Sequence, residues 1–283
     1  MTNKDKIFVK LNKENLLYFS DINRLPYYEK ENIYSFFIPE KLYTILGIKN
    51  FYELKKKYYF RLFCEPGTDF VKIEIKINKE QKDWIFLLEL ADTIYYQLEL
   101  SLIVIGDPNA PFFDVYHDRF GHRNYFATAK RNIEEESKAI LAGLYPHQSR
   151  KGLNLFDNLL DKLEIFCKNT EKHLIETDPL GYASAIFYEK KGFGYINGKK
   201  LMLKIDKEFY PKGLLYRKLD NSNIFRKQEY WDNVWGRSWA IHDGVLKEAL
   251  GVEFNHIKMY KPIGKKLKVN TFLTQGVNNE NRL

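Results

Sequence analysis

Two stretches of the sequence gather side chains that could do acid–base chemistry. The first, "DVYHDRFGHRN" at 114–124, contains Asp114, His117, Asp118 and His122. Imidazoles and carboxylates at this spacing could ligate a metal ion, or a histidine could act as general base because it titrates near neutral pH. Gly121 and its turn-forming neighbours predict a loop rather than a helix. We therefore expect a polar loop at the rim of a cleft, and we expect this loop to bind no metal. His122 is its candidate for a general base.

The second stretch, "WGRSWAIHDGVL" at 235–246, mixes bulky aromatic and ionisable side chains. His242 is another candidate for the general base, and Arg237, Trp239 and Asp243 are candidates for substrate binding. An arginine and a His-Asp pair could orient a substrate carboxylate or relay a proton. The alternative is that these side chains only pack in the core. Ser238 lacks the Gly-x-Ser-x-Gly setting of a hydrolase nucleophile.

A basic turn that contains a glycine, "HQSRKGLN" at 147–154, leads into an apolar stripe typical of a long helix. A helix N-terminus presents unpaired N–H groups and about half a positive charge, which suits a pyrophosphate. Arg150 and Lys151 add charge, and Gly152 lets the backbone approach phosphates closely. We expect the helix to begin near Gly152; an ordinary basic loop is the alternative. The candidate phosphate-binding residues are Gln148, Ser149, Arg150, Lys151, Gly152, Leu153 and Asn154.

The elements around these stretches predict an α/β or α+β protein with a mixed sheet flanked by helices. "PEKLYTILGI" at 39–48 and "NFYELKKKYY" at 50–59 have helical spacing. Strands are expected at 59–77, broken by Pro66-Gly67, then within 83–91, 95–105 and 172–177. The strand that ends at Ile105 is almost continuously apolar, so we expect it to be central in the sheet.

Three further segments have clear start or stop signals. "NIEEESKAILAGLYP" at 132–146 predicts a helix capped by Asn132 and ended by Gly143, and "YASAIFYEKKG" predicts one ended by Gly192. "GYINGKKLMLKI" at 194–205 predicts a hairpin around Asn197-Gly198.

The region from 143 to 204 resembles the GNAT superfamily of acyl-CoA N-acyltransferases. In that family, a strand leads into a Gly-rich turn and a long helix, and a second strand leads into a short helix ending in a pattern close to A-x-x-F-Y-E-K-x-G-F. Residues 187–193, "FYEKKGF", match this pattern, and Ser184 stands in place of the alanine. Ser149, Gly152 and Asn154 occupy the positions of the usual Q/R-x-x-G-x-G/A turn.

This resemblance implies a GNAT-like core at 59–206, an N-terminal segment at 1–58 and a C-terminal extension at 207–283 that lines the substrate side. It implies transfer of an acyl group from acetyl-CoA or another acyl-CoA to an amine of a small molecule or protein. A tyrosine matching Tyr188 often protonates the departing thiolate in this family, and a phenol with a pKa ordinarily near 10 is a suitable donor. The base would come from the 114–122 loop or from His242.

Composition leaves two other classes of function open. The net charge of +8, from 45 basic and 37 acidic residues, favours anionic partners. Nucleic acid is one such partner, but acidic residues accompany most lysine clusters and no nucleic-acid-binding motif is present. The second alternative is a GNAT-like domain that has lost catalysis and acts as a binding module.

The sequence also bears on location. No apolar run approaches the roughly 20 residues that span a bilayer, and the N-terminus lacks a secretory signal. Cys64 and Cys167 lie in apolar surroundings, which predicts reduced thiols. We expect a cytoplasmic protein without a membrane span.

Overall fold

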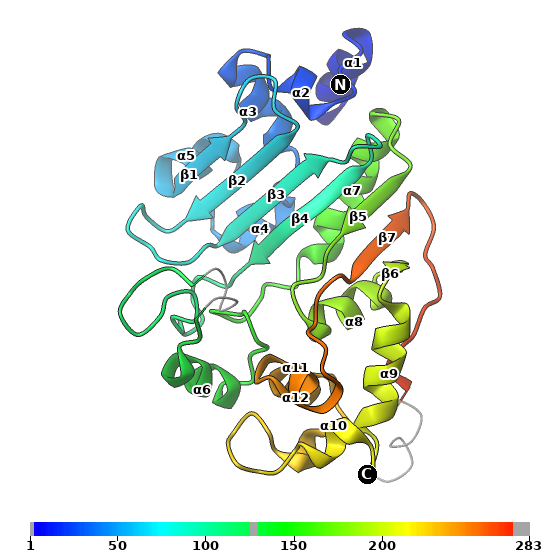
Figure 1. Cartoon of the computed structure of the whole chain (residues 1–283). Helices are drawn as coiled ribbons and strands as arrows, with labels where there is room; N and C mark the ends of the chain where they lie inside the picture. The colour runs from blue at the N-terminus through cyan, green and yellow to red at the C-terminus, as the bar shows by residue number, and fades with distance from the viewer. Residues whose placement is uncertain (1–2, 125–129, 274–283) are drawn as a thin grey trace, which may run out of the picture. The chain divides into compact units, whose positions relative to one another are not determined.

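The computed structural model describes residues 3–124 and 130–273 (Figure 1). Its backbone gathers into two units, and the chain passes between them several times. The first unit comprises Met1–Pro111, Arg150–Thr177 and Pro262–Lys265; the second comprises Phe112–Ser149, Asp178–Lys261 and Lys266–Leu283. The borders of these units do not coincide with the predicted domain boundaries at 58/59 and 206/207.

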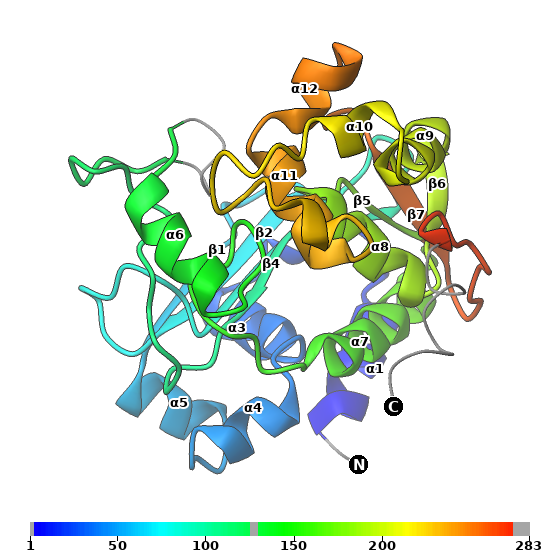
Figure 2. The same cartoon turned by 90° about the horizontal axis from the view of Figure 1, so that it is seen from below.

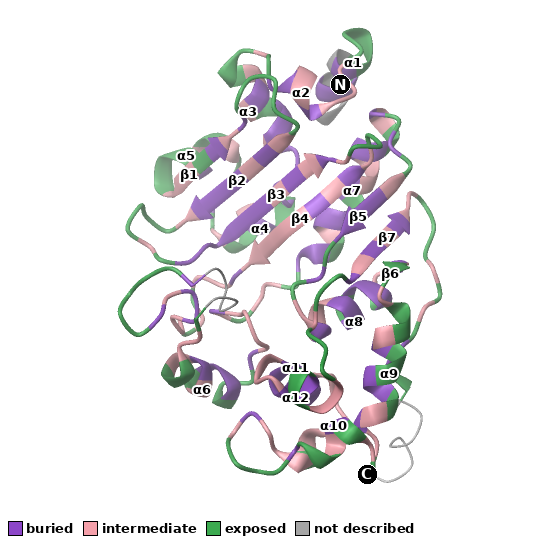
Figure 3. Ribbon diagram, viewed as in Figure 1, coloured by how far each residue is buried: buried purple, intermediate pink, exposed green. Residues whose placement is uncertain are grey.

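A mixed sheet with the strand order β1-β2-β3-β4-β5 forms the centre of the first unit. These strands are β1 (Tyr59–Phe63), β2 (Phe70–Lys76), β3 (Phe86–Asp92), β4 (Leu98–Ile105) and β5 (Leu174–Thr177). The first four pair antiparallel, whereas β5 runs parallel to β4 with Leu98 opposite Ile175. β2 and β3 are buried along most of their length (Figure 3). The predicted strands and the central position of β4 are confirmed.

Within the first unit, helices from the N-terminal segment and from the later 150–177 segment share one aromatic core. The helices are α1 (Asn3–Lys13), α2 (Phe19–Ile22), α3 (Tyr27–Ser35), α4 (Glu40–Ile45), α5 (Phe51–Lys57) and α7 (Phe156–Asn169). α4 and α7 cover one face of the sheet (Figures 1 and 2). The Phe166 ring of α7 stacks on Phe19 at 5.5 Å between centroids and meets Phe37 edge-on at 5.0 Å. Residues before Tyr59 therefore complete the core beneath the sheet.

The second unit is mostly helical. It contains α6 (Ile133–Leu141), α8 (Tyr182–Lys190), α9 (Lys199–Phe209), α10 (Leu214–Arg217), α11 (Val234–His242) and α12 (Val245–Leu250), with a 3-10 turn at Gln228–Tyr230. α11 packs on α8 and α12 (Figures 1 and 2). Two antiparallel strands, β6 (Gly194–Asn197) and β7 (Lys258–Pro262), pair with Gly194 opposite Tyr260.

The end signals of two helices are confirmed. The Asn132 side chain accepts a hydrogen bond from the Glu135 N–H and caps α6. Gly143 after α6 and Gly192 after α8 adopt φ of +77° and +88°, the left-handed conformation in which glycine ends a helix.

The predicted hairpin at Asn197-Gly198 is wrong. Gly198, with φ of +93°, ends β6, and the chain continues as α9; the partner of β6 is the distant β7. Met202, Ile205 and Phe209 recur at three- and four-residue steps and are fully buried, which is helical rather than strand periodicity. An asparagine-glycine pair is a strong hairpin signal, but here it precedes an amphipathic helix.

The long helix α7 begins at Phe156 rather than near Gly152. Gly152 forms an antiparallel bridge with Gly106, and the Leu153 N–H donates to the Ile105 carbonyl at 3.2 Å. These residues therefore extend the end of β4 before the helix starts. Asn154 then reverses the chain with φ of +56°, an angle that asparagine tolerates better than most residues.

Candidate functional site

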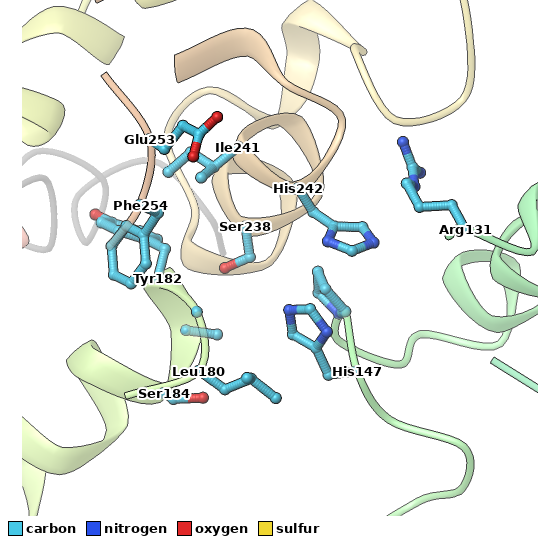
Figure 4. A pocket seen from close by; sticks show the side chains of 13 residues that line it. Arg131, His147, Leu180, Tyr182, Ser184, Ser238, Ile241, His242, Glu253 and Phe254 are labelled. Atoms are coloured by element: carbon cyan, nitrogen blue, oxygen red, sulfur yellow. The ribbon is translucent and has the colours of Figure 1, made fainter. Parts of the chain in front are cut away.

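A cavity of about 390 Å³ lies within the second unit (Figure 4). Three parts of that unit form its walls: Arg131 with Pro146 and His147, the chain from Leu180 to Ser184 at the start of α8, and α11 with the loop at 253–254. Its volume is within the usual range for small-molecule sites. Because both basic and apolar side chains line it, the cavity could hold a small molecule with polar and apolar parts.

His242 is the best-positioned acid–base group in this cavity. Its Nε2 lies 3.0 Å from Oε1 of Glu136, a carboxylate on α6 whose side chain is only 1% exposed. Within the described part of the chain, the other ring nitrogen, Nδ1, makes no hydrogen bond. The His147 ring meets the His242 ring edge-on, with 4.7 Å between centroids (Figure 4). A histidine held by a carboxylate in this way is a suitable general base.

An ion-pair network fixes Glu136. Its Oε2 is 2.6 Å from the Arg131 guanidinium, which also pairs with Asp243, and Asp243 in turn pairs with Arg226 at 2.5 Å. Burial alone would raise the pKa of the Glu136 carboxyl, but His242 and Arg131 outweigh it and hold this pKa below its ordinary value. Glu136 is therefore ionised at neutral pH and accepts hydrogen bonds from both partners.

The start of α8 forms the opposite wall. Gly181 is the N-cap residue of α8 and has no side chain that could cap the first-turn N–H groups. His147 adopts a φ of +68°, and its Nε2 lies close to the backbone of Gly181. A β-carbon added at position 181 would be 3.4 Å from this nitrogen. Leu180, Ile241 and Phe254 supply apolar surface.

The predicted substrate-binding residues use their polar groups inside the protein. Arg237 is completely buried, donates to Asp206 at 2.7 Å and to the Trp231 carbonyl at 2.6 Å, and reaches no surface. Trp239 is 1% exposed and donates its indole N–H to the Leu144 carbonyl at 2.9 Å. Asp243 belongs to the ion-pair network behind His242. Of the residues predicted in this stretch, only His242 lines the cavity.

Tyr188 lies on the helix whose first turn lines the cavity, six residues beyond Tyr182, or roughly 9 Å along the axis. Its side chain is buried and packs on Phe187 and Phe193, with ring centroids 5.8 Å and 5.0 Å away. The left-handed Gly192 and the fully buried Phe193 hold this end of α8 in place.

The predicted phosphate-binding turn is divided between the units. Gln148 and Ser149 belong to the second unit, where the Gln148 side chain accepts from the Tyr145 N–H and the Ser149 carbonyl from the Phe113 N–H. Arg150, in the first unit, pairs with Asp83 and donates to the carbonyl of Ala110.

The rest of the turn lies beside the N-terminus of α7. Lys151 and Asn154 are exposed, and Leu155, the N-cap residue, provides no side-chain cap for α7.

The 114–124 loop is held by contacts within itself and by hydrogen bonds from the Asn132 side chain at the start of α6 to the carbonyls of Asp114 and His117. His117 Nδ1 lies 2.6 Å from Asp114, while an Asp118 oxygen accepts the N–H groups of Phe120 and His122. The His122 side chain is 78% exposed and is not among those that line the cavity. Within residues 3–124 and 130–273, no group of three or more His, Cys, Asp or Glu side chains could hold a metal ion.

Sequence reasoning missed Glu136, Arg131 and His147. Glu136 lies within the predicted 132–146 helix, Arg131 immediately before it, and His147 at the start of the basic 147–154 turn, but none of the three stood out as a partner of His242. Only the fold brings them to His242, which is 95 residues beyond His147 in the chain. No local sequence signal could have identified this grouping.

Comparisons of this chain with protein-family models, with curated proteins and with solved structures found no match. Among the helices in the described ranges, none is both long and apolar enough to cross a membrane.

Proposed function

We propose that this protein is an N-acyltransferase that moves an acyl group from an acyl-CoA thioester to an amine of a small molecule or protein. The observation that carries the proposal is His242 in the cavity wall, held from behind by Glu136. Amide formation requires a base to remove a proton from the attacking nitrogen, and His242 faces a cavity large enough for an acceptor. The cavity is the proposed acceptor site.

Two features of the backbone support acyl-CoA as the donor. β4 and β5 are parallel neighbours, and the chain between them contains α6, the 147–154 turn and then α7; a turn that leads into a long helix before the next strand is also part of the GNAT-like order described above. Lys151 is exposed near the N-terminus of α7, where helix N–H groups favour anions. In this proposal, these groups bind the pyrophosphate and Tyr188 protonates the departing thiolate.

A binding module without acyl transfer is the second candidate, and one observation favours it. The Leu153 N–H donates to Ile105, and the Arg150 guanidinium pairs with Asp83 and backbone carbonyls. These donors are among those that the family resemblance assigns to pyrophosphate. Such a module would bind a small molecule in the cavity but would have no affinity for CoA.

Binding of CoA separates the two candidates. Millimolar acetyl-CoA or CoA should raise the melting temperature of an acyltransferase, because a ligand that binds only the folded state stabilises it. Lys151→Ala should weaken binding roughly tenfold, since it removes one charge-assisted contact. Lys168→Ala is the matched control, because Lys168 is an exposed lysine in the last turn of the same helix. No shift with either ligand would support the binding module instead.

Turnover tests the chemistry. Wild-type protein with acetyl-CoA and a mixture of amines should release free thiol, and mass spectrometry should detect the acylated amine. Tyr188→Phe should lower kcat about 100-fold while leaving the affinity for CoA unchanged, since it removes only the proton donor. Full turnover by this variant would exclude Tyr188 as the acid.

A further inference from the structure

We infer that Nδ1 of His242 is the atom that accepts the proton from the acceptor amine, and that Glu136 is the positioning residue that sets the required tautomer; this inference rests on the proposed acyl transfer. A neutral imidazole carries one hydrogen, and only its unprotonated nitrogen can act as a base. The question is therefore which ring nitrogen carries the hydrogen.

The contacts of Glu136 determine the tautomer. Its carboxylate is ionised and can only accept hydrogen bonds, so Nε2 of His242, 3.0 Å away, must be the protonated nitrogen. Nδ1 then keeps its lone pair. Because Glu136 does not line the cavity whereas His242 does, the nitrogen that is not bound to Glu136 is the one available to a ligand.

Arg131 holds Glu136 in the position from which its carboxylate accepts a hydrogen bond from Nε2 of His242. A guanidinium has donors only, and it approaches Oε2 at 2.6 Å from Nη2 and 2.7 Å from Nε. Each oxygen of Glu136 therefore has its own partner: Oε1 binds His242 and Oε2 binds Arg131. Trp239 limits rotation of the imidazole, with its ring centroid 5.8 Å from that of His242, and His147 packs edge-on against it.

The amine nitrogen bonds to the acyl carbon and gives its proton to Nδ1 of His242. The carbon–sulfur bond of the thioester breaks, and the sulfur takes a proton from the phenol of Tyr188. The products are an amide and free CoA thiol, and the two side chains return to their starting states by exchanging protons with water.

The geometry makes a specific prediction for Glu136→Gln. Arg131 can only donate, so the amide oxygen of the glutamine must face Arg131 and its NH2 group must face His242. Nε2 would then have to accept a hydrogen bond, and the hydrogen of the neutral ring would move to Nδ1. The variant would keep the shape and packing of the site but would present N–H, rather than a base, to the cavity.

Nitrogen NMR of protein labelled with ¹⁵N-histidine measures this directly at about pH 9, where imidazoles are ordinarily neutral. The resonances of His242 are identified by their loss in His242→Gln. We expect hydrogen on Nε2 in the wild-type protein and on Nδ1 in Glu136→Gln. Glu248→Gln is the control: it removes a carboxylate from the same ion-pair network, where Glu248 binds Arg226, and should leave the tautomer unchanged. A wild-type ring with hydrogen on Nδ1 would overturn the inference even if the variant does not fold.

Kinetics provide the second measurement. Glu136→Gln should lower kcat by about 100-fold or more and leave the KM for acyl-CoA unchanged, because the tautomer affects the proton transfer and not donor binding. An unchanged kcat would overturn the inference. If the tautomers are as expected but the wild-type protein transfers no acyl group, the proposed function fails while the assignment of the ring nitrogens holds.

Discussion

At the residue scale, Glu136 contacts the Arg131 guanidinium and the His242 imidazole, and its protonation should couple the stability of the protein to pH. Its pKa is lowered in the folded protein, so the carboxylate stabilises the fold at pH values above its unfolded pKa of about 4.3. This contribution is lost as the pH falls through the lowered folded value. Protonation then leaves Arg131 and His242 without their shared anion.

Unfolding by urea at several pH values tests this linkage. At pH 7, Glu136→Gln should lower the free energy of unfolding by about 3 kcal/mol, because it removes one partner from a buried ion pair. The difference from wild type should shrink as the pH falls below about 4.3. Glu134→Gln, an exposed change on the same helix, should have little effect at any of these values. A difference that stays constant down to pH 3 would contradict the lowered pKa.

The end of α8 makes a prediction at the scale of elements. Gly192 has φ of +88°, and a β-carbon there would lie 2.8 Å from the Lys266 α-carbon, so an alanine would suffer both backbone strain and a clash. Gly143 at the end of α6 has a similar φ of +77° but open space around it. Gly143→Ala should therefore cost about 1 kcal/mol and Gly192→Ala about 3 kcal/mol. Equal losses, measured by thermal unfolding, would show that Lys266 moves aside without cost.

Most elements were predictable because their signals are local. Pro66-Gly67 marked the break between two strands, and Asn132 with Gly143 marked the two ends of α6. The hairpin error arose where two local signals conflicted, since the turn dipeptide precedes an amphipathic helix. The site was only partly predictable: His242 stood out by type, but its carboxylate partner lies 106 residues earlier in the chain.

At the scale of the whole molecule, the chain passes repeatedly between the two units, and the second unit includes residues both before and after Asp206. We therefore expect the second unit to need the residues beyond 206 in order to fold. Asp206 is buried against Arg237, and the indoles of Trp235 and Trp239 both donate to the Leu144 carbonyl. β6 also takes its partner strand, β7, from this region. A chain ending at Asp206 would leave a buried carboxylate unpaired and one wall of the cavity missing.

We therefore expect the 1–206 chain to lose the fixed packing of the second unit. Its near-UV circular dichroism should be much weaker than that of the full chain, and it should bind ANS, as proteins with exposed apolar surface do. The first unit keeps β1–β5 and the aromatic contacts of Phe166, so part of the helix and strand signal should persist. If the 1–206 chain instead unfolds cooperatively at the melting temperature of the full chain, residues 207–283 are a dispensable extension. In that case, any activity that the 1–206 chain retains could not depend on a base at His242.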